Sequence, residues 1–154
     1  FFFKQKTAYD RLKDVKTLIK EYTDSLGIDL SFQSFEKEMS DLKGKYGPPR
    51  GSMHLCYVDD EAVGIIALTD FDGKRGEMKR LYVKPQYRGK GIARKLSEII
   101  IEDAKKIGYE GLLLDSLSDM KTAQALYYSL GFEEIPPYYE NPIPGTVYMY
   151  KKLK

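Results

Sequence analysis

The sequence predicts a single α+β domain, and three patterns support this fold class. Apolar and branched residues in Met53–Val58 and Ala62–Leu68 flank a short acidic turn, which is typical of an antiparallel hairpin. A turn over residues 70–76 leads into a strand that carries Glu77, so three consecutive antiparallel strands precede a helix. The apolar run Leu112–Leu114 follows that helix, which implies a parallel strand pair joined by a right-handed crossover. With 154 residues, the chain is long enough to bury one core.

Two helices are expected before the hairpin. In Asp10–Leu26 the apolar residues recur at helical spacing and line one face, and Gly27 is a typical helix stop. A second helix is expected to begin at Ser31 or Ser34, either of which is a good capping residue, and to run through Leu42.

The second half of the chain is expected to alternate helices and strands. Apolar residues at helical spacing predict a helix over Ile92–Ile107 that ends near Gly108. Asp119 is a suitable cap for a short helix that Gly131 ends. The remaining segment, Phe132–Leu153, is expected to hold two strands joined by a proline-rich loop.

The first ten residues are set apart from this fold. The run Lys4–Tyr9, with the sequence KQKTAY, resembles the translation of a common sequencing-library adapter. We therefore expect residues 1–10 to be a non-native segment and residues 11–154 to form the domain. If so, the native first strand is missing, and the strand Met53–Val58 has an unpaired edge that favours aggregation.

Composition excludes several classes of function. The 25 basic and 23 acidic residues leave a net charge of +2, and the basic residues are scattered, so nucleic acid is not an expected partner. No apolar run reaches the ~20 residues that span a membrane. The single cysteine suits a reducing cytosol, so a cytoplasmic location is expected. With one histidine and one cysteine, no metal site is predicted. His54 and Cys56 lie on the same strand face, which could suggest a thiol–imidazole pair. No helix start lies nearby to lower the pKa of the thiol, so packing in the core or on the surface is the favoured role of both.

A strand, a glycine-rich turn and a helix start predict a site for an anion. Gln86, Gly89 and Gly91 form the pattern Q-x-x-G-x-G directly before the helix. The first turn of a helix has unpaired N–H groups and a partial positive charge, and glycines allow a phosphate to approach it closely. Arg88 and Lys90 add formal charge at the same place. A tight turn without a ligand is the simpler interpretation of a lone G-x-G.

This turn resembles the acyl-CoA-binding motif of the GNAT superfamily of N-acetyltransferases. A second block over residues 123–132, with the pattern A-x-x-L-Y-x-x-L-G-F, resembles the same family. The resemblance implies a mixed, mostly antiparallel central sheet flanked by about four helices, with a V-shaped opening between the fourth and fifth strands. It also implies acetyl-CoA as co-substrate, held by the strand and the turn at Leu81, Tyr82, Val83, Gln86, Tyr87, Arg88, Gly89, Lys90, Gly91, Ile92 and Ala93.

The resemblance assigns two catalytic residues. Glu77 stands where family members commonly place a general base, and Tyr127 stands where they place the tyrosine that meets the leaving sulfur. The alternatives are a solvated charge at a strand start and a core aromatic on a helix. The sequence departs from the family at Met120, where many members have an asparagine that contacts the cofactor. The cofactor would then be held by the turn and the strand alone, unless Asp119 partly substitutes for the asparagine.

The acceptor pocket is expected to lie on the first two helices and the proline-rich loop. Its candidate contacts are Phe32, Phe35, Tyr138 and Tyr139, for which core packing or a rigid loop is the simpler role. Strand alternation places Glu77 and Lys79 on one face and Arg80 on the other. A cation near the site would hold an amine that bears a carboxylate, such as an amino acid.

We therefore expect an N-acetyltransferase that transfers the acetyl group directly to a primary amine in a ternary complex. The acceptor is a small molecule or a peptide amine, with no nucleic acid or membrane as partner. A non-catalytic acyl-CoA sensor is the opposing class, and a longer acyl donor is a third possibility. Replacing Tyr127 by Phe distinguishes the first two, because only the enzyme loses turnover while it keeps cofactor binding.

Overall fold

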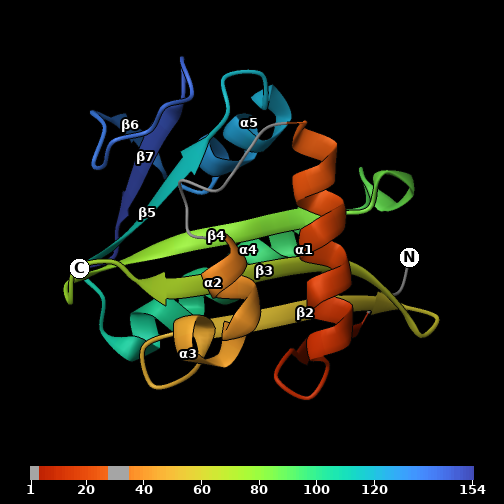
Figure 1. Cartoon of the computed structure of the whole chain (residues 1–154). Helices are drawn as coiled ribbons and strands as arrows, with labels where there is room; N and C mark the ends of the chain where they lie inside the picture. The colour runs from red at the N-terminus through yellow and green to blue at the C-terminus, as the bar shows by residue number, and fades with distance from the viewer. Residues whose placement is uncertain (1–3, 28–34) are drawn as a thin grey trace.

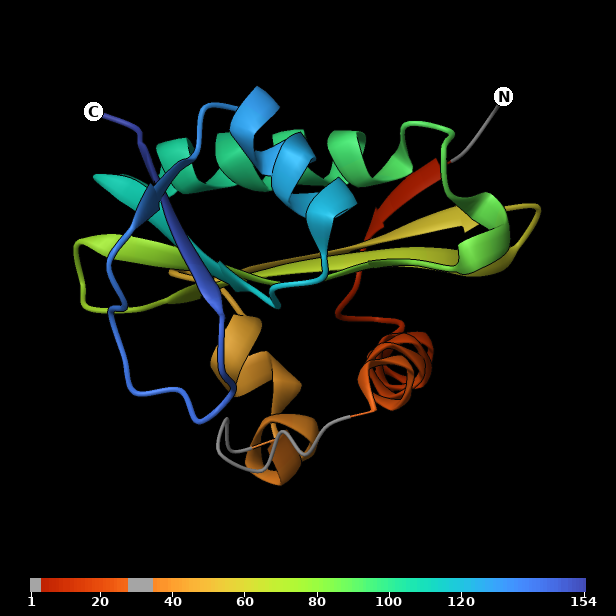
Figure 2. The same ribbon diagram turned by 90° about the horizontal axis from the view of Figure 1, so that it is seen from above.

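The computed structural model describes residues 4–27 and 35–154, which form a sheet between two layers of helices. Seven strands pair in the order β1-β2-β3-β4-β5-β7-β6 (Figure 1). Viewed from above, α4 and α5 cover one face of the sheet, while α1, α2 and α3 cover the other (Figure 2). The strands are β1 (Lys4–Thr7), β2 (Ser52–Val58), β3 (Glu61–Asp70), β4 (Arg75–Val83), β5 (Gly111–Ser116), β6 (Glu133–Ile135) and β7 (Val147–Lys152). The helices are α1 (Leu12–Leu26), α2 (Phe35–Ser40), α3 (Leu42–Tyr46), α4 (Ile92–Ile107) and α5 (Lys121–Ser129).

The strand directions confirm the predicted fold class. β4 and β5 run parallel, joined by α4, whereas the other neighbouring strands pair antiparallel. The hairpin of β2 and β3 turns at Asp59 and Asp60, which both have positive φ, as a two-residue hairpin turn requires. The mixed, mostly antiparallel sheet is therefore the one that the sequence predicts.

Each face of the sheet has its own apolar core. Leu96, Ile100 and Ala104 of α4 pack against one face, and Val15 and Ile19 of α1 pack against the other. These residues are spaced by four along their helices, so one stripe of each helix is buried.

The sheet opens between its fourth and fifth strands. β4 and β5 pair only at Arg75 with Gly111, Gly76 with Leu112, and Glu77 with Leu113. Beyond Glu77, β4 continues to Val83 without a partner on that side. Figure 1 shows the two strands diverging, as the family resemblance implies.

A β-bulge in β4 overturns the expected direction of Arg80. Ile65 lies opposite Tyr82 and Ala67 lies opposite Lys79, so β4 holds one more residue than β3 in this stretch. Arg80 lies in the bulge and has a φ of 63°. Its guanidinium therefore lies on the face covered by α2, where it bonds to Glu38, and not on the opposite face.

The helices differ from the prediction in two places. The expected helix through Leu42 is divided at Asp41, whose side chain accepts a hydrogen bond of 2.9 Å from the N–H of Gly44 and so starts a new helix. The described ranges hence contain five α-helices, one more than the roughly four expected, because the second is divided in two. The residue that precedes α5 is Met120, which makes no capping bond, so Asp119 is not the cap.

The N-terminal residues form an edge strand. β1 pairs antiparallel with β2 from Lys4 opposite Tyr57 to Thr7 opposite His54. The expectation that β2 has an unpaired edge is therefore wrong for this chain. The non-native origin of residues 1–10 stays a prediction.

Candidate active site

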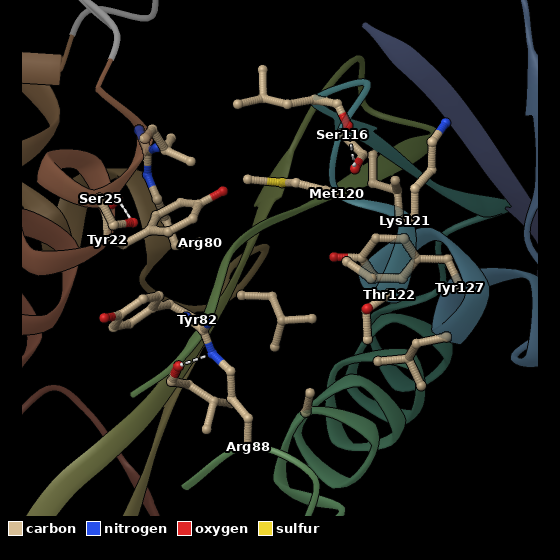
Figure 3. Close-up of a pocket in the computed structure, with 18 of the residues that line it drawn as sticks. Tyr22, Ser25, Arg80, Tyr82, Arg88, Ser116, Met120, Lys121, Thr122 and Tyr127 are labelled. Carbon is tan, nitrogen blue, oxygen red and sulfur yellow. Dashed lines mark hydrogen bonds between the residues drawn. The ribbon is translucent and has the colours of Figure 1, made fainter. Parts of the chain in front are cut away.

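The opening between β4 and β5 forms a cavity of about 750 Å³. Its walls come from the end of α1, from β4, from the glycine turn and the start of α4, and from the segment that joins β5 to α5. Figure 3 shows Tyr22, Arg80 and Tyr82 on one side of this space and Met120 and Tyr127 on the other. The cavity therefore passes between the two halves of the sheet.

The glycine turn and the start of α4 form one end of the cavity. Gly89 and Gly91 have φ values of 79° and 85°, and an added Cβ at either would meet open space. α4 begins at Ile92 without a side-chain cap, so its first N–H groups remain available to a ligand. The Nε of Arg88 donates to the carbonyl of Val83 at 2.8 Å, which fixes this arginine beside β4. This end suits a pyrophosphate.

The structure brings most of the predicted cofactor residues together. Of those expected from the sequence, nine line the cavity: Leu81, Tyr82, Val83, Tyr87, Arg88, Gly89, Gly91, Ile92 and Ala93. Gln86 and Lys90 are exposed and do not line it. Asp119 and Met120 both line the opposite wall, where the family has its asparagine.

Tyr127 reaches the cavity from α5. Its hydroxyl points into the space between β4 and β5 (Figure 3) and makes no hydrogen bond within the described residues. The ring packs edge-on against Phe132 at a centroid distance of 5.9 Å, which holds its direction. Burial raises the pKa of the Tyr127 phenol, so this group stays protonated at neutral pH and remains a proton donor. The neighbouring Tyr128 is 51% exposed and lies outside the cavity.

Glu77 lies where β4 and β5 separate. Its side chain is nearly buried, and its Oε2 accepts a hydrogen bond of 2.7 Å from the hydroxyl of Tyr138. Its Oε1 lies 4.0 Å from Nζ of Lys79. Glu77 does not itself line the cavity, although the following residues Met78 and Lys79 do. One oxygen of the carboxylate is thus oriented by Tyr138.

The proline-rich loop places a cluster of tyrosines beside Glu77. The hydroxyl of Tyr139 donates to Asp115 at the end of β5, and Tyr138 packs against Tyr139 and Tyr148. Burial and the negative charges of Glu77 and Asp115 raise the pKa of both loop tyrosines. Tyr138 and Tyr139, which were expected to contact the acceptor, do not line the cavity, but each bonds to a carboxylate beside it.

The two predicted phenylalanine contacts have different outcomes. Phe35 is half-buried on α2 and packs against the core on that face, with the guanidinium of Arg80 5.8 Å from its ring centre. It does not line the cavity. Phe32 lies outside the described residues.

Several residues of the cavity were not predicted from the sequence. Tyr22 and Ser25 come from the end of α1, and Asp115 comes from β5, whereas Asn141 belongs to the proline-rich loop that was expected beside the acceptor pocket. Asp115 had a signal, because it directly follows the buried run of β5 at the point where the parallel strands separate. The others depend on packing between distant segments, which local sequence patterns do not report.

Two further classes of site are not found in the described part of the chain. No group of three or more His, Cys, Asp or Glu side chains there has an arrangement that could hold a metal ion. None of the helices there is both long and apolar enough to cross a membrane.

Comparison with known proteins identifies the family. The profile of the acetyltransferase (GNAT) family matches residues 15–132. An N-acetyltransferase of Schizosaccharomyces pombe is 43% identical over 141 residues, which cover 90% of this chain and 86% of the relative. A GNAT-family acetyltransferase of Staphylococcus aureus has a similar fold, with a TM-score of 0.83 at 21% identity over 99% of this chain and 100% of that one. The PaiA N-acetyltransferase of Thermoplasma acidophilum, solved in complex with coenzyme A, has a TM-score of 0.72 at 19% identity over 99% of this chain and 100% of that one. The chain therefore belongs to the GNAT family and is an N-acetyltransferase.

Proposed function

We propose that this enzyme transfers the acetyl group of acetyl-CoA directly to a primary amine while both are bound. The observation that carries the proposal is the unpaired stretch of β4 beyond Glu77, which opens a cavity with an anion site at one end. Tyr127 reaches this cavity from the opposite wall, and Glu77 stands where the strands separate. A small molecule or a peptide amine is the acceptor, and a cytoplasmic location stays our expectation.

The chain supplies groups that match the two ends of acetyl-CoA. The uncapped start of α4 and the two glycines with positive φ bind the pyrophosphate, with Arg88 beside them. The free edge of β4 from Leu81 to Val83 pairs with the amides of the pantetheine arm, and its N–H groups stabilise charge on the acetyl oxygen. Acetyl-CoA supplies an activated thioester, so neither a metal nor a covalent nucleophile is required.

Two side chains move the protons. Glu77 accepts the proton that the amine loses, either directly or through a water molecule. Tyr127 donates its proton to the departing sulfur, which its raised pKa permits because the phenol is protonated at neutral pH. Holding amine and thioester side by side contributes much of the remaining rate.

Thiol release that depends on acetyl-CoA tests this proposal. The purified enzyme is assayed with polyamines, amino acids, aminoglycosides and short peptides, and release with one amine class is expected. Tyr127→Phe should lower kcat by about 100-fold or more because a general acid is lost. Its affinity for acetyl-CoA, measured by calorimetry, should change little. Tyr128→Phe is the matched control and should leave kcat unchanged, since that side chain is exposed.

Two results would contradict the proposal. Full turnover in Tyr127→Phe would show that Tyr127 is not the general acid, and the sulfur would then take its proton from water. Binding of acetyl-CoA without release for any amine would favour the non-catalytic sensor.

A further inference from the structure

Lys79 is a largely buried cation that lines the cavity beside Glu77. It lies on β4 two residues after Glu77 and lines the cavity, and its side chain is only 14% exposed. Its Nζ lies 4.0 Å from Oε1 of Glu77, which is too far for a hydrogen bond. No acceptor in residues 4–27 or 35–154 takes a hydrogen bond from this ammonium group. Its three donors are therefore open to a ligand.

The two neighbouring cations are already paired with a carboxylate. Arg80 donates two hydrogen bonds of 2.8 Å to the two carboxylate oxygens of Glu38. Lys45 donates to the same carboxylate at 3.1 Å. Of these three cations, Lys79 is the one that donates no hydrogen bond to a carboxylate in the described residues.

This environment favours an anion beside Lys79. Burial lowers the pKa of the Lys79 ammonium, the charges of Arg80 and Lys45 lower it further, and Glu77 opposes the change. A buried charge without hydrogen-bond partners is unfavourable, and a carboxylate that entered the cavity would supply them.

We propose that Lys79 binds the carboxylate of the acceptor and that the acceptor is an α-amino acid. This inference rests on the proposed function, because it names the amine that the enzyme acetylates. It assigns to Lys79 a binding role that sets specificity.

The spacing of the two charges fits this class of ligand. Tyr138 occupies Oε2 of Glu77, so Oε1 remains for the amine of the acceptor. Oε1 and Nζ of Lys79 are 4.0 Å apart, and an α-amino acid carries its amine and its carboxylate on one carbon atom. A single small molecule therefore places its amine against Glu77 and its carboxylate against Lys79.

The reaction that follows is balanced. The amine nitrogen forms a bond to the acetyl carbon, and the bond from that carbon to sulfur breaks. Glu77 takes the proton of the amine, and the sulfur takes the proton of Tyr127. Exchange with water restores both side chains.

The test compares α-amino acids with their own α-amides, which keep the amine and the side chain but lack the negative charge. In the unaltered enzyme, kcat/KM for the acid should exceed that for the amide by about tenfold or more. Lys79→Met, which keeps the length of the side chain, should raise KM for the acid by about tenfold and abolish the preference. Lys79→Arg should retain part of it. Comparing the acid-to-amide ratio between variants cancels the different basicity of the two amines.

Controls separate binding from folding. Lys20→Met changes an exposed lysine of α1 and should leave both substrates unaffected. In Lys79→Met, KM for acetyl-CoA should stay at the level of the unaltered enzyme, and the loss of kcat/KM should be larger for the acid than for the amide. An equal loss on acid and amide would show a structural role and overturn the inference.

The failures are distinguishable. Equal turnover of acids and amides by the unaltered enzyme would overturn the role of Lys79 and leave the acetyltransferase proposal intact. Absence of thiol release with every amine would contradict both.

Discussion

Among single residues, Tyr138 has the clearest effect on the candidate base. Its hydroxyl donates to one oxygen of Glu77, and its ring is held by edge-on contacts with Phe71 and Tyr148. A carboxylate that is oriented in this way presents its other oxygen to the amine without having to reorganise. In the proposed mechanism, Tyr138 is thus a positioning residue that acts through Glu77.

Removing this hydroxyl should slow the chemical step. Tyr138→Phe keeps the ring contacts but loses a hydrogen bond to a charged group, so kcat should fall by about tenfold. Steady-state kinetics with acetyl-CoA and the best amine of the panel measure the change, and KM for acetyl-CoA should stay constant. Tyr148→Phe is the matched control, because Tyr148 belongs to the same cluster but has no bond to Glu77 in the described chain. If both variants lose the same activity, the effect comes from the cluster and not from the bond.

Among the elements, the bulge of β4 and helix α2 are joined by one buried ion pair. Arg80 and Glu38 are both buried and form a bidentate contact. Burial alone would raise the pKa of Glu38, but the hydrogen bonds from Arg80 and the charges of Arg80, Lys45 and Lys79 lower it to about 2. The pair therefore ties α2 to the strand that forms the wall of the cavity.

This pair should make stability depend on pH. Because the pKa of Glu38 falls from an ordinary 4.5 to about 2 on folding, its contribution is complete above pH 4.5 and is lost as the pH falls toward 2. The size of the shift corresponds to about 3 kcal/mol of unfolding free energy. Urea unfolding should show Glu38→Gln less stable by a similar amount at pH 7, with a difference that shrinks in acid. Glu36→Gln, an exposed neighbour on α2, should show no such change. A difference that is constant with pH would rule out the ion pair as its cause.

The order of the elements follows from sequence patterns, but the details of the site do not. Periodicity and turn residues predict the three antiparallel strands, the crossover through α4 and the last two strands, because each pattern lies within one segment. The bulge at Arg80 is not visible in this way, since a strand with one inserted residue has the same composition as a regular one. The contact between Tyr138 and Glu77 joins residues 61 positions apart, and only the folded chain brings them together.

For the whole molecule, the N-terminal strand closes one edge of the sheet. β1 pairs with β2, Ala8 is fully buried, and the hydroxyl of Tyr9 donates to the carbonyl of Tyr46 at 2.7 Å. Whatever the origin of this segment, residues 4–7 pair with β2 and cover backbone groups that would otherwise be exposed.

Removing this strand should lower the stability of the protein and cause it to aggregate. A chain that begins at Arg11 should lose on the order of 2 kcal/mol of unfolding free energy, because several backbone hydrogen bonds and the buried Ala8 are removed. It should also self-associate through the exposed edge of β2, as sedimentation at increasing concentration would detect. A chain that begins at Lys4 is the control and should behave as the full chain does. Equal stability and a monodisperse solution for the shorter chain would refute this role of β1.

The separation of β4 from β5 gives the co-substrate a second role in this protein. Three residue pairs join the half of the sheet that holds β1–β4 to the half that holds β5–β7. A pantetheine arm bonded along the free edge of β4 would substitute for the strand pairs missing there. Its binding energy would then also hold the two halves together. The melting temperature of the enzyme would thus rise with the concentration of its own acetyl donor, and the enzyme without that donor would unfold at a lower temperature than the enzyme that has bound it.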